Sequence, residues 1–169
     1  MDQQLEHDFD TDLEYSNEEN EMFDNFYKRI FPTLERIEMV TDLTLQFLGI
    51  DKKLHFKNGK TVLIDEKKRR EDYGDILLEE YSDYHRKRVG WIGSKKHTDY
   101  IVYAIMPSKK IYIFPFLILQ QVWLNNYHDY VAMFGREFSS NRGYVTSNIP
   151  VPVDVLLNSM NIEMQDTLN

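Results

Sequence analysis

The stretch that decides the fold is TVLIDEK at residues 61–67, an apolar run that passes directly into two acids and a lysine. Residues two apart on a β-strand face the same side of a sheet. Asp65 and Lys67 are therefore expected to project together, while Glu66 points away and offers its backbone carbonyl. Taken alone, the same charges would also fit a solvent-exposed strand end. The residues expected beside them in the fold distinguish this interpretation from a functional site.

The turn sequence KNGK at residues 57–60 joins this stretch to a preceding extended segment and predicts a β-hairpin. A two-residue turn would pair Asp51 with Glu66, on the face away from Asp65. A three-residue turn with Gly59 in the left-handed conformation would pair Asp51 with Asp65 on one face. A bulge nearer the strand ends would have the same effect. Only the last two arrangements bring the two aspartates together.

The rest of the chain alternates helical and extended patterns, which predicts an α/β (α+β) fold with a mixed central β-sheet flanked by helices. Pro150 and Pro152 suggest that the last extended segment lies at a sheet edge. The expected order is a short helix ending near Phe31, a helix over 32–48 that stops at Gly49, the hairpin strands 51–56 and 61–69, a strand over 75–82, an irregular basic stretch over 84–97, strands over 100–105 and 111–114, a helix over 115–134, an extended segment over 143–153 and a final helical turn over 155–160.

Charge is distributed unevenly along the 169 residues, whose net charge is -8. Residues 1–24 hold ten of the 28 acids and none of the 20 Lys and Arg, so residues 25–169 carry 20 bases against 18 acids, a net of +2. We therefore expect an acidic, disordered leader over residues 1–20 and a single domain over 21–169. The basic balance of the body is compatible with nucleic acid as a partner.

The chain has no cysteine, which excludes disulfides, zinc-thiolate sites and thiol nucleophiles. Its longest apolar run, residues 111–119, falls far short of the ~20 residues that span a bilayer. The first residues lack the apolar core of a signal peptide. We expect no membrane association and a cytoplasmic location.

Two carboxylates and a backbone carbonyl at one strand end suit a hard, oxygen-preferring ion such as Mg²⁺ or Mn²⁺. A lysine beside that ion can orient and help deprotonate a water that attacks phosphorus, while the ion stabilises charge on the phosphoryl oxygens.

The spacing of Asp51 from Asp65-Glu66-Lys67, after a helical segment and within a hairpin, resembles the PD-(D/E)XK superfamily of restriction-endonuclease-like nucleases. The resemblance covers about residues 33–153 and implies a core of order α-β-β-β-loop-β-β-α-β. The chain departs from the motif at Ile50, which replaces its proline. Further similar pieces are Asp42 and Gln46 before GID (49–51), EYS (80–82), GW (90–91) and TDYIV (98–102).

This resemblance implies a role for each motif residue. Asp51 and Asp65, with the Glu66 carbonyl, would bind Mg²⁺ or Mn²⁺, and Lys67 would complete the catalytic set as base or water-orienting group. Members of the superfamily often add an acid. The candidates are Glu35, Glu38 and Glu80, with Glu38 preferred over Glu35 because it shares a helical face with Asp42 and Gln46 at i, i+4, i+8.

Three functions remain open at this stage. The first is a divalent-metal-dependent nuclease acting on DNA, with a homodimer suggested by analogy with compact members. The second is a catalytically silent module of the same fold that binds nucleic acid or a protein partner, and the third is an acidic DNA mimic or interaction protein. Trp91 and Tyr84 fit base stacking or core packing. The candidate phosphate contacts are Lys68, Arg69, Arg86, Arg88, Lys95 and Lys96.

Overall fold

The computed structural model describes residues 18–167, and side chains as far as residue 165. The chain divides into two compact units, Met1–Glu38 with Leu54–Thr61, and Met39–Lys53 with Val62–Asn169. Each unit is described by itself. The predicted acidic leader lies outside the described residues over residues 1–17, and its expected boundary after residue 20 falls inside the helical residues 18–30.

The first unit contains this helix, which buries Phe23, Phe26 and Tyr27. These aromatic residues recur at spacings of three and four, so they line one helical face. The helix stops before Phe31, as predicted, and the Phe31 ring packs edge-on against Phe56 with centroids 5.4 Å apart.

The prediction of a continuous helix over residues 32–48 is wrong. The segment forms strand β1 (Leu34–Met39) and, after a break, the short helix α2 (Leu43–Phe47). Asp42 causes the break because its carboxylate accepts hydrogen bonds from Thr44 N–H at 2.7 Å and Leu45 N–H at 3.4 Å, which makes it an N-cap. The apolar spacing that suggested one helix therefore spans two elements.

Gly49 ends α2, as the sequence predicted, with φ +78° and its N–H bonded to the Gln46 carbonyl at 2.9 Å. The next N–H, of Ile50, bonds back to the Leu45 carbonyl at 3.0 Å. Such a left-handed turn satisfies the last helical carbonyls and is favoured by glycine. It directs the chain from α2 into strand β2 (Lys52–Phe56).

The hairpin between β2 and β3 (Thr61–Arg69) has the three-residue turn. Phe56 N–H bonds to the Lys60 carbonyl at 2.9 Å, Gly59 N–H bonds to the Phe56 carbonyl at 2.9 Å, and Gly59 has φ +80°. Of the two turn lengths that the sequence left open, this is the one that pairs Asp51 with Asp65 rather than with Glu66.

The strands form two sheets, whereas one mixed sheet was expected. The five-stranded sheet has the order β1-β2-β3-β6-β7 and contains β6 (Tyr100–Ile105) and β7 (Lys110–Pro115), with β6 parallel to β3 and antiparallel to β7. The four-stranded antiparallel sheet has the order β5-β4-β9-β8, with β4 (Asp75–Asp83), β5 (Arg88–Val89), β8 (Glu137–Asn141) and β9 (Tyr144–Pro152). The mixed α+β class is confirmed; the predicted core order is not.

The expected edge position of residues 143–153 is wrong, because β9 lies between β4 and β8. The sequence analysis missed β8, whose sequence EFSSN is mostly polar. Pairing to β8 covers only Tyr144–Asn148, so Pro150 and Pro152 lie beyond it and pair with β4 alone. A proline is tolerated there because no partner on the second side needs its missing N–H.

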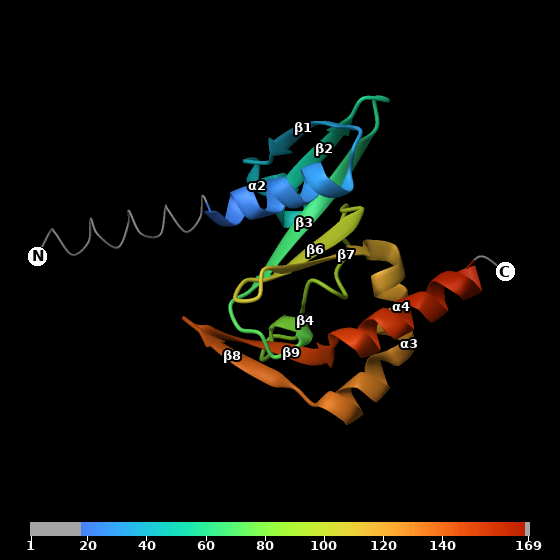
Figure 1. The fold of residues 1–169 in the computed structure, drawn as a ribbon. Coiled ribbons are helices and arrows are strands. Elements are labelled where there is room, and N and C mark those ends of the chain that lie inside the picture. The colour runs from blue at the N-terminus through green and yellow to red at the C-terminus, as the bar shows by residue number, and fades with distance from the viewer. Residues whose placement is uncertain (1–17, 168–169) are drawn as a thin grey trace, which may run out of the picture. The chain divides into compact units, whose positions relative to one another are not determined.

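Helices α3 (Phe116–Phe134) and α4 (Val153–Thr167) pack on each other and on β9 (Figure 1). The α3 prediction is confirmed, whereas α4 is much longer than the single turn expected. Together with strands of both sheets they enclose the main core of the second unit. This core contains Ile76, Leu78, Ile92, Ile101, Tyr103, Ile105, Phe114, Phe116, Leu119, Val122, Trp123, Tyr130, Ile149, Val151, Leu156 and Met160.

Candidate active site

The centre of the candidate site is Asp65, in the middle of β3, with only 1% of its surface exposed. Its two carboxylate oxygens each contact an ammonium group. Lys67 Nζ bonds to Oδ1, and Lys96 Nζ lies 2.7 Å from Oδ2. The pairing of Lys67 with Asp65 follows from strand alternation, as the sequence predicted. That of Lys96 does not, because 31 residues separate the two.

Asp51 lies against Asp65. Its Oδ2 accepts the Glu66 backbone N–H at 2.8 Å, and its own N–H bonds to the Ile64 carbonyl at 2.8 Å. Burial raises the pKa of the Asp51 carboxyl above its usual value, and the neighbouring Asp65 charge raises it further. Two carboxylates thus share one small volume, as the three-residue turn predicted.

The Glu66 side chain points away from this pair, as expected. Its carboxylate lies 3.2 Å from Lys52 Nζ, and both side chains are almost fully buried. Only the Glu66 backbone remains as a contribution to the site, through the N–H that binds Asp51 and through the carbonyl predicted as a metal ligand.

Gly49 and the segment after Ser94 bring Lys96 to Asp65. His97 N–H bonds to the Leu48 carbonyl at 2.8 Å, next to Gly49. A Cβ at Gly49 would lie 2.8 Å from Lys96 Nζ and 3.1 Å from Asp65 Oδ2, so a side chain there would occupy the place of the ammonium group. The glycine that ends α2 therefore also makes room for this ion pair.

The same segment is anchored to β3 by two side chains. Asp99 Oδ2 accepts the Leu63 N–H at 2.8 Å, and Thr98 Oγ1 donates to the Leu63 carbonyl at 3.0 Å. These bonds hold the chain beside β3 just before it enters β6, so Lys96 has a defined position.

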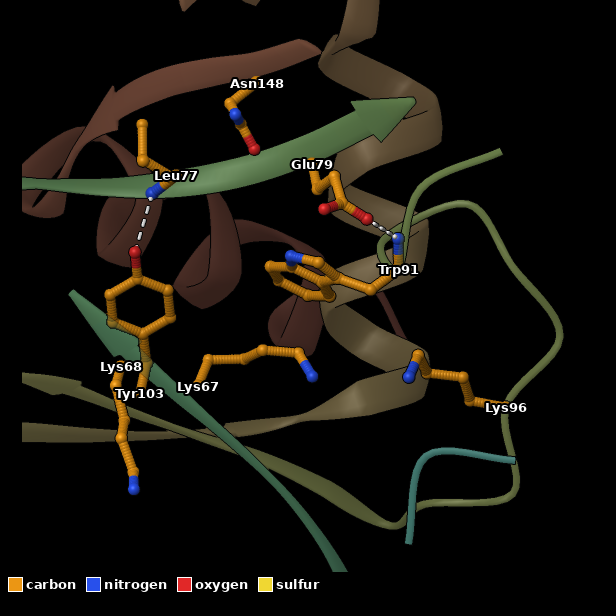
Figure 2. Close-up of a pocket in the computed structure, with 8 residues that line it drawn as sticks. All are labelled: Lys67, Lys68, Leu77, Glu79, Trp91, Lys96, Tyr103 and Asn148. Carbon is orange, nitrogen blue, oxygen red and sulfur yellow. Dashed lines mark hydrogen bonds between the residues drawn. The ribbon is translucent and has the colours of Figure 1, made fainter. Parts of the chain in front are cut away.

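A pocket of about 410 Å³ opens beside the two lysines. Figure 2 shows the ammonium groups of Lys67 and Lys96 directed toward each other across its floor, with the Trp91 indole between Lys67 and Glu79. The complete lining is Lys67, Lys68, Leu77, Glu79, Trp91, Lys96, Tyr103 and Asn148, all in the second unit.

The donor set fits a divalent ion in part. Within residues 18–167 there is no cluster of three or more His, Asp or Glu side chains suited to a metal. Asp51 and Asp65 would supply two carboxylates and Glu66 a carbonyl, and Mg²⁺ commonly binds through one or two carboxylates with waters and substrate phosphate completing its shell. Burial is the main cause of the raised pKa of Asp51, and the charge of Asp65 adds to it, while Lys67 acts in the opposite direction.

Glu38 and Glu80, the candidates for an additional acid at the metal site, both have other hydrogen-bond partners. The helical face that favoured Glu38 is absent. Glu38 lies on β1, not on a helix, and its carboxylate bonds to His55 at 3.0 Å and to Arg36 at 2.9 Å. Glu80 is bonded to Tyr127, to Ser147 at 2.9 Å, and to Arg136 through both oxygens. Glu79, which the sequence analysis passed over, is the acid of β4 that lines the pocket.

Two of the predicted phosphate contacts, Arg69 and Lys96, are already paired with a carboxylate in the structure. Arg69 is 3% exposed and pairs with Asp75 at 3.0 Å, because it follows Asp65 and Lys67 on a buried face of β3. Lys96 is bound to Asp65 and its side chain is 12% exposed. The other four predicted contacts, Lys68, Arg86, Arg88 and Lys95, are exposed.

Sequence reasoning missed Glu79 and Asn148 and left Trp91 open between two roles. One signal for Glu79 was available. Ile76 and Leu78 alternate toward the core of β4, which places Glu79 on the other face and leaves the next acid, Glu80, buried. Asn148 carried no comparable signal, because its place depends on the pairing of β9 with β4, which are 61 or more residues apart.

Comparison with known proteins gave no relative. No protein-family model matches the chain, and neither the curated proteins nor the solved structures contain a match. Among the helices of residues 18–167, none combines the length and apolarity required to cross a bilayer.

Proposed function

We propose that the protein is a divalent-metal-dependent nuclease that hydrolyses phosphodiester bonds, with DNA as the expected substrate. The observation that supports this most directly is the adjacency of the Asp51 and Asp65 carboxylates on the face of β3 that also carries Lys67. Adjacent carboxylates are unfavourable without positive charge beside them; Lys67 and Lys96 supply this charge to Asp65, and a divalent ion would supply it to both carboxylates. The proposal also rests on the resemblance of these residues to the PD-(D/E)XK motif.

Each residue has a distinct role under this proposal. Asp51, Asp65 and the Glu66 carbonyl hold Mg²⁺ or Mn²⁺, which supplies charge stabilisation at the phosphoryl oxygens. Lys67, as an ammonium group, would orient the attacking water by a hydrogen bond and stabilise negative charge on the phosphoryl oxygens. The Asp65 contact holds the Lys67 ammonium on the correct face of β3.

A second function has one observation in its favour. Both oxygens of Asp65 are already neutralised by lysines, so this half of the site is balanced without a metal. A catalytically silent module that uses the lysines to hold nucleic acid would have the same arrangement.

Cleavage assays with two variants, Lys67→Ala and a control, separate the two functions. Purified wild-type protein is incubated with supercoiled plasmid and with end-labelled oligonucleotides in Mg²⁺, Mn²⁺ or EDTA. The nuclease requires metal-dependent cleavage that Lys67→Ala slows by ~10²–10⁴-fold, the usual contribution of a general acid–base group. Lys60→Ala, at an exposed position in the turn between β2 and β3, is the control and should cleave at close to the wild-type rate.

Asp65→Asn addresses the metal itself. It should abolish Mn²⁺ binding in a calorimetric titration, whereas Lys67→Ala should retain it. Because Asp65 is buried and paired, this variant is also expected to lose about 3 kcal/mol of stability, so its folding is checked by circular dichroism. Wild-type protein that binds Mn²⁺ and oligonucleotide but cleaves neither substrate would support the silent module instead.

A further inference from the structure

The pocket beside Asp65 has a lining that the hydrolysis of a phosphodiester does not require. Trp91, Glu79 and Asn148 take no part in holding a metal or activating water, yet they surround a space of about 410 Å³ that also receives Lys67 and Lys96. This volume is within the range of pockets that bind small organic ligands.

Asn148 supplies an amide group to the lining of this pocket. It is 7% exposed and lies on β9 opposite Glu79. No side-chain hydrogen bond from Asn148 to any of residues 18–167 is found, although buried amides are ordinarily bonded. In Figure 2 its amide group is directed into the pocket. An amide presents a donor and an acceptor side by side, the pattern with which asparagine recognises the edge of a nucleobase.

Glu79 and Trp91 are held in place beside this amide. Glu79 Oε1 accepts the Trp91 backbone N–H at 3.1 Å. This approach depends on Gly90, where a Cβ would lie only 2.0 Å from the Glu79 carbonyl oxygen. Gln120 of α3 fixes the following turn by donating to the Ile92 and Ser94 carbonyls. The indole is therefore an aromatic surface with a defined position, partly exposed and next to two polar groups.

Two lysine ammonium groups lie on the floor of the pocket. The Lys67 ammonium lies 5.9 Å from the centre of the Trp91 ring, and Lys96 faces it. One ligand thus meets an aromatic face, an amide and the Glu79 carboxylate on one side, and the two ammonium groups that pair with Asp65 on the other. A nucleotide has a matching division, since its base stacks and hydrogen-bonds while its phosphate is anionic.

We propose that this pocket binds the base of one unpaired nucleotide next to the bond that is cleaved, so that the substrate is single-stranded nucleic acid. A base within a duplex is stacked and paired on both sides, and placing it in the pocket would cost a few kcal/mol. This inference rests on the proposed function for the position of the cleaved bond, whereas binding of the base itself does not require catalysis.

Binding is tested without cleavage, in EDTA. The Trp123→Phe variant leaves Trp91 as the single tryptophan, and its fluorescence is followed while a 12-nucleotide single strand, or the same strand annealed to its complement, is added. The single strand should quench Trp91 and bind at least tenfold more tightly than the duplex. Circular dichroism first establishes that Trp123→Phe is folded; if it is not, fluorescence anisotropy of a labelled strand with wild-type protein replaces the quenching measurement.

Asn148→Ala in this background should weaken single-strand binding by about 5–150-fold, the range for a two-bond contact to a base edge. Asn141→Ala, on the exposed edge strand β8, is the matched control and should bind as before. A series of single strands, each with an abasic site at a different position, locates the bound base. At one position the abasic site should weaken binding of the parent protein as much as Asn148→Ala weakens binding of the intact strand. For that abasic strand, Asn148→Ala should cause no further loss of affinity.

The outcomes separate this inference from the proposed function. Equal binding of single strand and duplex, or unchanged binding by Asn148→Ala, overturns the base pocket even if the protein cleaves DNA. Selective single-strand binding that depends on Asn148 supports the pocket even if no cleavage is found with Mg²⁺ or Mn²⁺.

Discussion

The Lys96 ammonium lies 2.7 Å from the Asp65 carboxylate, in a position where it competes with any cation for the same oxygen. The other oxygen contacts Lys67, which strand alternation holds in place. Lys96 comes from a different segment and can leave without any change in β3. A metal that binds Asp65 would therefore displace Lys96 more readily than Lys67, and the released ammonium would be available to the substrate phosphate.

Replacement of Lys96 tests this competition. Lys96→Met keeps the aliphatic stem and removes the charge, so Mn²⁺ should bind roughly tenfold more tightly, as expected when a cation a few ångströms away is lost. Isothermal titration calorimetry measures the affinity. The exposed neighbour Lys95→Met is the control and should bind Mn²⁺ as the wild type does. Weaker binding by Lys96→Met would mean that Lys96 organises the carboxylates and does not compete with the metal.

Gly49→Ala tests the space that Lys96 occupies. The new Cβ would lie 2.8 Å from Lys96 Cδ and Nζ, so the lysine must move, and the left-handed backbone adds a cost of about 1–2 kcal/mol. Gly74→Ala is matched to it, since Gly74 has φ +72° but nothing within 4 Å of a Cβ. Both variants should lose similar stability in urea denaturation, and only Gly49→Ala should change Mn²⁺ affinity. A Mn²⁺ affinity that changes equally in both would assign the effect to backbone strain.

Asp51→Asn should stabilise the metal-free protein at neutral pH. The pKa of Asp51 is raised in the folded state by burial and then by the Asp65 charge, so the ionised carboxylate destabilises the fold above that pKa. This penalty disappears as the pH falls through the raised pKa, because the group then takes up a proton. The thermal midpoint of Asp51→Asn in EDTA should therefore exceed that of wild type at pH 7 by a few degrees and converge with it in acid.

The exposed Asp129→Asn on α3 serves as the control for this pH series and should track the wild type throughout. Asp51→Asn should also lose Mn²⁺ affinity, since a neutral amide replaces an anionic ligand. A lower thermal midpoint for Asp51→Asn at pH 7 would mean that the ionised form is stabilised in the fold and that the two carboxylates are not in conflict.

Glu80→Gln is expected to affect stability and not metal binding. Burial raises the pKa of Glu80, but hydrogen bonds from Arg136, Tyr127 and Ser147 outweigh it and the net pKa is lowered. The ionised carboxylate thus stabilises the fold above its unfolded pKa, and this contribution is lost as the pH falls through the folded pKa. Glu80→Gln should cost about 2 kcal/mol at pH 7 in urea denaturation, below the usual range for a buried pair because Arg136 remains partly in water.

Glu79→Gln is the matched variant on the same strand. It should leave the stability near that of wild type and alter single-strand binding, because Glu79 lines the pocket and bonds only through Oε1 to Trp91 among the hydrogen bonds found. A loss of Mn²⁺ affinity in Glu80→Gln would return Glu80 to the metal site as the additional acid that the sequence suggested.

The sequence by itself determined the local geometry of the site. The alternation of TVLIDEK placed Asp65 and Lys67 on one face and turned Glu66 away, because the two-residue strand period depends only on neighbouring residues. The turn KNGK predicted the hairpin but left two turn lengths open, and the structure decided for the one that adds Asp51 to this face. The same locality explains why α3 and the strands over 75–82 and 100–105 were predicted. The prediction from local patterns was wrong over residues 32–48, because the N-cap residue Asp42 was interpreted as part of a helical face.

Only the tertiary structure decided which distant groups meet this face. Lys96 reaches Asp65 because the chain after Ser94 is anchored to β3 and because Gly49 leaves room, and both conditions join segments far apart in sequence. Glu79 and Asn148 lie opposite each other because β4 pairs with β9 in a second sheet, which no local sequence pattern predicted. Strand period and turn chemistry are properties of a few consecutive residues, whereas partner choice between strands depends on how the whole core packs.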